Sequence, residues 1–120
     1  MRKFRTSLQC AIRGITFAWR GERNFRILST IGIFVFFGAT LLRFSIVELG
    51  FLTLAIALVL SAEMINTIVE ELLDIIRPDY SEHVGRVKDL AAGAVLLLSL
   101  FSVVIGVLTV LHHLAASGNT

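Results

Sequence analysis

Three long stretches of this chain contain no charged side chain, and they constrain the fold more than any other feature. They cover residues 27–42, 49–62 and 90–111. A helix that spans a membrane needs about 20 apolar residues. The third stretch is long enough alone, and arginines that snorkel from its ends can extend the first. The second is long enough only if its helix continues past Glu63 to about residue 76.

The composition supports a membrane protein over a soluble one. Apolar residues make up 56% of the 120 residues and charged residues 17%, against about 45–50% and about 25% in soluble domains. A small soluble domain has little interior for this excess, and a disordered chain would be more polar. Because lipid offers the backbone no hydrogen-bond partners, the spans must be helices. We therefore expect an all-α membrane protein, a single domain over residues 1–120, with spanning helices at about 27–43, 48–76 and 89–111.

Residues 1–25 follow a different pattern. Apolar side chains recur every three or four positions and arginines lie between them, as in a helix that rests on the membrane surface. Trp19 is the expected interfacial anchor. A helix packed on a soluble partner is the alternative. Arg77 and Pro78 should end the second span, residues 77–88 form the expected polar loop, and residues 112–120 form an expected frayed tail. The apolar positions of the surface helix are Phe4, Leu8, Ile12, Ile15 and Trp19.

The basic residues predict the orientation. Of the 11 Lys and Arg residues, all except Arg43 precede the first span or lie in residues 77–88. Such residues favour the cytoplasmic side. We expect a membrane protein with a cytoplasmic N-terminus and an external C-terminus. The net charge of +2 is small, and no nucleic-acid partner is expected. A single cysteine, Cys10, excludes an internal disulfide and a thiolate metal cluster.

The second span contains the main chemical signal. Glu63, Asn66, Glu70 and Asp74 are spaced by three, four and four residues, so they share one face of a helix. A charge near the lipid is costly, from about 2.5 kcal/mol upward, and neighbouring carboxylates repel each other. A divalent cation would relieve both costs, and oxygen ligands suit Mg²⁺. The alternative is a solvated stripe just outside the membrane.

Two further clusters fall on the same side of the membrane. Glu22 interrupts the basic N-terminal segment, although a pair with Arg26 one helical turn later explains it equally well. Lys88 and Asp89 precede the third span. An anionic substrate, Mg²⁺ and a membrane-buried base suggest phosphoryl transfer to a lipid alcohol, in which the protein mainly positions groups and neutralises charge. The sequence lacks the phosphate-binding loop and the soluble-kinase motifs.

In this reading Glu63 accepts the proton of the lipid hydroxyl. Glu22 and Glu70 hold Mg²⁺ on the phosphates of the nucleotide, and Lys88 stabilises phosphate charge. Two other functions remain open at this stage. A small cation-coupled transporter would use Glu63 as its intramembrane carboxylate, and a scaffold subunit would use no chemistry at all.

The string from Glu63 to Asp74, joined to the segment 88–96, resembles the prokaryotic diacylglycerol kinase and undecaprenol kinase family. Residues 22–26 resemble the branch that phosphorylates undecaprenol. The resemblance implies a homotrimer with shared active sites in a bacterial inner (cytoplasmic) membrane, MgATP as the phosphate donor, and Glu63 as the catalytic base. Cys10 departs from one branch, which has a tyrosine near the nucleotide. By position, the resemblance also implies that Asn66 and Asp89 are catalytic, that Lys3, Glu22, Glu70, Asp79, Tyr80, Lys88 and Asp89 bind the nucleotide, that Glu22 and Glu70 bind the metal, and that Glu63 and Ala92 contact the lipid.

The resemblance favours undecaprenol as the lipid alcohol, with undecaprenyl phosphate as the product. Diacylglycerol, giving phosphatidic acid, is the alternative. Both lipids present a hydroxyl group at the level of the headgroups.

Overall fold

Four helices make up the part of the chain that the structure describes, which is residues 2–79 and 81–118 of a computed structural model. In chain order they are α1 (Arg2–Gly21), α2 (Arg23–Leu41), α3 (Ile46–Ile76) and α4 (Glu82–Gly118). The last three are long and apolar enough to cross a membrane. The all-α fold and the three candidate spans are therefore as the sequence predicts.

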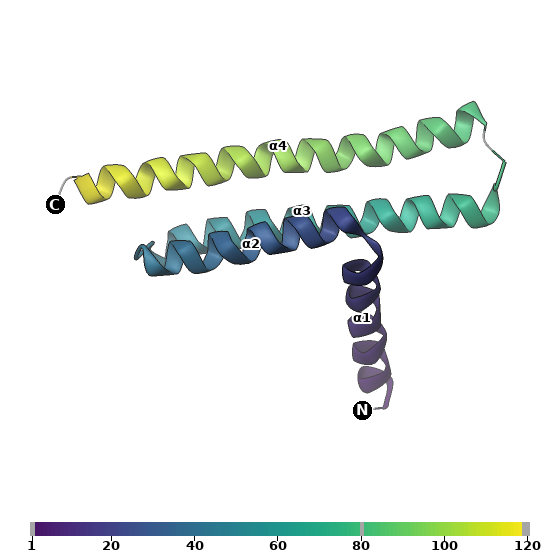
Figure 1. Cartoon of the computed structure of the whole chain (residues 1–120), viewed down its shortest axis with the longest axis horizontal. Helices are drawn as coiled ribbons and strands as arrows, with labels where there is room; N and C mark the ends of the chain where they lie inside the picture. The colour runs from purple at the N-terminus through teal and green to yellow at the C-terminus, as the bar shows by residue number, and fades with distance from the viewer. Residues whose placement is uncertain (1, 80, 119–120) are drawn as a thin grey trace.

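The three long helices lie side by side, with α3 between α2 and α4 (Figure 1). Short connections make each helix antiparallel to the next. The first helix packs on α2 and projects sideways from the other three (Figure 1). Only 11% of the apolar window of α4 is buried within the chain, so most of this helix is left for lipid or another protein to cover.

The fourth helix is longer than the sequence suggested at both ends. It begins at Glu82, not near residue 89, so the expected loop at 77–88 shrinks to residues 77–81. The hydroxyl of Ser81 accepts a hydrogen bond from the backbone N–H of Val84 at 3.2 Å, which caps the new helix start. The preceding helix ends at Ile76, directly before Arg77 and Pro78, as expected.

The first two helices also meet earlier than expected. The predicted surface helix over residues 1–25 ends at Gly21, and α2 already begins at Arg23. Glu22 lies between them in an extended conformation, with φ −111 and ψ 107. The first span, α2, ends at Leu41 rather than residue 43. The third helix begins at Ile46 because Ser45 and Glu48 form a reciprocal capping box.

Glu48 also ties the start of α3 to the end of α4. Its side chain is 8% exposed, and its two oxygens lie 2.8 Å from Nδ1 of His112 and 3.1 Å from Nδ1 of His113. The ring of Phe44 stacks on His113, with 3.9 Å between the ring centroids. These contacts hold residues 112–118 in the helix, so the expectation of a frayed tail there is wrong. Residues 119 and 120 lie outside the described part of the chain.

Candidate active site

Three carboxylates predicted to act together meet where α1 turns into α2. Glu22 is the residue at that turn, and its side chain makes no capping hydrogen bond. Glu63, in the middle of α3, is only 7% exposed. The carboxylates of Glu22 and Glu70 both lie close enough to Glu63 to act on it electrostatically. The structure therefore brings residues that are 48 positions apart into one acidic corner, which we define as Glu22, Glu63 and Glu70.

An unpaired polar atom lies next to this acidic corner. The amide nitrogen of Asn66 is 3.4 Å from Oε1 of Glu70. The amide oxygen of Asn66 is buried and accepts no hydrogen bond from any described residue. Leaving such an atom unpaired costs about 1–3 kcal/mol. A hydroxyl group or a water molecule on a metal ion would supply the missing donor.

The donor set of the acidic corner fits Mg²⁺. It contains carboxylate and amide oxygens and no nitrogen or sulfur ligand, which is the chemistry that Mg²⁺ prefers. Within residues 2–79 and 81–118, no group of three acidic, histidine or cysteine side chains is placed so that it could hold a metal ion. Magnesium in nucleotide sites is commonly held by one or two carboxylates together with phosphate oxygens, so three protein ligands are not required.

Lys88 lies at the start of α4 and pairs with a residue near the end of α3. Its Nζ is 3.0 Å from Oδ1 of Asp74, and both side chains are well exposed. The 31 residues of α3 extend about 46 Å, whereas the hydrocarbon layer is about 30 Å thick. The end of α3 that carries the acidic residues can therefore project beyond the lipid, where a water-soluble ligand can reach it.

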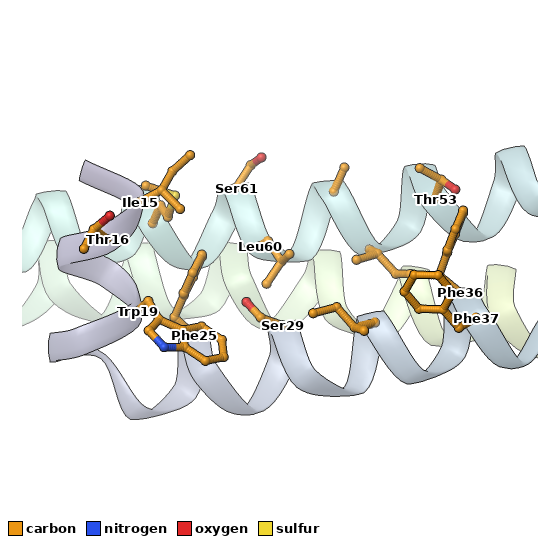
Figure 2. A pocket seen from close by; sticks show the side chains of 15 residues that line it. Ile15, Thr16, Trp19, Phe25, Ser29, Phe36, Phe37, Thr53, Leu60 and Ser61 are labelled. Carbon is orange, nitrogen blue, oxygen red and sulfur yellow. The ribbon is translucent and has the colours of Figure 1, made fainter. Parts of the chain in front are cut away.

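A large apolar cavity opens between α1, α2 and α3 (Figure 2). Its volume is about 740 Å³. Trp19 and Phe25 line the end near the turn between α1 and α2, and Phe36 and Phe37 line the other end (Figure 2). Met64, which directly follows Glu63, is also part of the wall. The carboxylates themselves do not line the cavity, and Met64 is the wall residue that adjoins Glu63 in the chain.

The remaining predicted site residues do not join this corner within one chain. Asp89 and Ala92 are exposed on α4, and Ala92 does not line the cavity. Asp79 lies in the exposed connection between α3 and α4. Lys3 is exposed near the start of α1, about 28 Å along that helix from Glu22 at 1.5 Å per residue. Tyr80 lies outside the described residues.

Two features of the corner were not expected from the sequence. Arg26 does not pair with Glu22; its guanidinium instead binds backbone carbonyls of α1. The cavity wall also includes Gly32 and Ser29 of α2. Small residues within an otherwise bulky apolar run are the signal that could have marked this wall.

Comparison with known proteins agrees with the resemblance seen in the sequence. The family model for prokaryotic diacylglycerol kinase matches residues 9–110, most of the chain. The chain belongs to the prokaryotic diacylglycerol kinase family. The matched residues include the acidic corner, Lys88 and the residues that line the cavity.

Two proteins similar to this chain are named as lipid kinases. The chain is 36% identical over 101 residues to a diacylglycerol kinase from Synechocystis sp., and the match covers 83% of this chain and 58% of the relative. It is 33% identical over 114 residues to an undecaprenol kinase from Bacillus subtilis, covering 95% of this chain and 93% of the relative. The chain thus spans little more than half of the first relative, and nearly all of the second. Neither protein is named as a transporter.

Proposed function

We propose that this protein is an integral-membrane lipid kinase that transfers the γ-phosphate of ATP to the hydroxyl group of a lipid alcohol. The observation that carries the proposal is the buried carboxylate of Glu63, on which Glu22 and Glu70 act, directly before a wall residue of the apolar cavity. An apolar lipid acceptor and a charged phosphate donor can meet only where an apolar surface adjoins a polar one. Membership of a kinase family supports the same reaction.

Each residue of the corner has a role in this proposal. The carboxylate of Glu63 accepts the hydroxyl proton from the lipid, and the unpaired oxygen of Asn66 orients the acceptor. Glu22 and Glu70 would hold Mg²⁺, which when bound supplies positive charge to the phosphates. Lys88, now paired with Asp74, turns to the phosphate groups when the nucleotide binds.

The lipid alcohol we favour is undecaprenol, with undecaprenyl phosphate as the product. Residues 22–26 resemble that branch, and the undecaprenol kinase of Bacillus subtilis matches this chain along almost its whole length. Diacylglycerol remains the alternative, because the relative from Synechocystis sp. is named for it. In this second case the product is phosphatidic acid.

We further propose a homotrimer in the inner membrane with the acidic corner on the cytoplasmic side. In this arrangement α1 rests on the membrane surface, where its apolar side chains, 50% or more exposed at Phe4, Leu8 and Ile12, enter the headgroup layer. A neighbouring subunit completes the site with Lys3, Asp79, Tyr80 and Asp89. Shared sites would also cover the exposed apolar face of α4.

The test is transfer of labelled γ-phosphate from ATP to undecaprenol or to diacylglycerol, by purified protein in detergent micelles. We expect transfer that needs both Mg²⁺ and a lipid alcohol. Glu63→Gln should lower the rate by about 10²–10⁴-fold, as for loss of a general base. Glu71→Gln is the matched control, because Glu71 is an exposed carboxylate on the same helix. Full activity in the Glu63 variant would show that the base is assigned wrongly, and ion flux in liposomes without ATP would favour a transporter.

A further inference from the structure

The turn between α1 and α2 leaves the last carbonyl groups of α1 without their usual helical partners. The backbone N–H of Glu22 still bonds to the carbonyl of Ala18 at 2.9 Å. The chain then bends at Glu22, so the next carbonyls, of Trp19 and Arg20, have no N–H one turn ahead. These exposed carbonyl groups take their hydrogen bonds from water or from side-chain donors.

Arg26 supplies these donors from the first turns of α2. Its Nη1 lies 3.0 Å from the carbonyl oxygen of Trp19 and 2.9 Å from that of Arg20. A cation at a helix C-terminus is also favoured by the helix dipole. Because the guanidinium group is rigid and planar, one side chain links two helices and restricts the angle between them.

The same hydrogen bonds keep the guanidinium group of Arg26 away from the carboxylate of Glu22. Arg26 and Glu22 form no ion pair in the structure, although they are four residues apart. The positive charge is engaged at the end of α1, and the carboxylate of Glu22 acts on Glu63 across the turn. Packing supports the same arrangement, because Ala18 and Phe25 on either side of the turn are 5% and 6% exposed.

We propose that Arg26 is a positioning residue that holds Glu22 in the acidic corner by capping α1 from α2. It touches no reacting group itself. This inference rests on the proposed function insofar as Glu22 binds Mg²⁺. The placement of α1 against α3 can be tested without any activity.

The first test measures that placement directly. Cys10 is the only cysteine of the chain and is exposed on α1. A nitroxide on Cys10 and a second one on Leu72→Cys, at an exposed site of α3, report the distance between the helices when labelled protein is diluted with unlabelled protein. Arg26→Gln should shift or broaden this distance, and Arg26→Lys should do so less. Arg23→Gln, which removes an exposed charge from the same turn, should leave the distance unchanged.

The second test measures the Mg²⁺ concentration that gives half-maximal lipid phosphorylation. Arg26→Gln should raise it by about 10–100-fold, as loss of a group that orients a metal ligand does, and excess Mg²⁺ should restore most of the rate. In the background of Glu22→Gln the Arg26 substitution should have little further effect. An Arg26→Gln protein with unchanged distance, or with a lower rate at an unchanged Mg²⁺ requirement, would overturn the inference. If the wild type phosphorylates no lipid, the proposed function fails, and the distance measurement alone decides whether Arg26 holds the turn.

Discussion

Gly32 of α2 lies in close contact with Ile56 of α3. A Cβ atom at this position would lie 2.8 Å from Cγ2 of Ile56, and 3.6 and 3.7 Å from Cγ1 and Cδ1. The side chain of Ile56 cannot easily move aside, because Cγ2 is attached to its Cβ and χ1 of a β-branched residue is stiff. Gly32→Ala must therefore separate the two helices or distort Ile56.

Two effects set the magnitude. Overpacking of a close contact costs about 1–3 kcal/mol, whereas replacing glycine by alanine within a helix gains about 1 kcal/mol. We expect Gly32→Ala to lower the free energy of unfolding by up to about 2 kcal/mol. Gly38 is the matched control on the same helix, because a Cβ there meets nothing within 4 Å, and Gly38→Ala should not destabilise.

The assay is unfolding in mixed micelles with increasing denaturing detergent, followed by circular dichroism. Ile56→Ala removes the clashing methyl group, so it should cost less in the Gly32→Ala protein than in the wild type, as a double-mutant cycle measures. Equal stability of the Gly32 and Gly38 variants would refute the reasoning, since it would mean that the helices do not approach each other as closely as the structure indicates. Gly32 also lines the apolar cavity. A changed KM for the lipid in the Gly32→Ala protein would therefore report on the cavity wall.

Three further predictions concern the two ends of the bundle. Glu70→Gln should raise the Mg²⁺ concentration for half-maximal lipid phosphorylation by about tenfold or more, and an unchanged requirement would remove Glu70 from the metal site. Lys88→Ala should raise the KM for ATP, whereas Asp74→Asn should change it little because an exposed ion pair contributes about 0–1 kcal/mol; equal effects in steady-state assays would contradict this. Glu48→Gln keeps the capping box but loses the charge that faces both histidines, so its thermal unfolding midpoint should fall, and His112→Gln should lower it little further in the double variant.

The membrane class and the number of helices were predictable from the sequence, because they depend on local composition. Uncharged apolar stretches of sufficient length must become helices in lipid, and Arg77 and Pro78 end a helix wherever they occur. The shared face of Glu63, Asn66 and Glu70 follows from the period of the helix. Helix ends were less predictable, since they depend on single contacts such as the Ser81 cap on Val84.

The contacts between helices were not predictable from local patterns. Glu22 could equally have paired with Arg26, and only the fold shows the arginine capping α1 while the carboxylate approaches Glu63. In the same way, no spacing rule connects Glu48 with His113, which is 65 residues away.

The amino-acid sequence by itself determined which segments are helical and apolar, because backbone hydrogen bonding and transfer to lipid act on each segment separately. Only the tertiary structure decided which polar groups meet, because that depends on how the helices turn and pack against one another. The acidic corner and the cavity exist for this second reason: a bend at one residue sets α1 across α2, and α2 packs on α3.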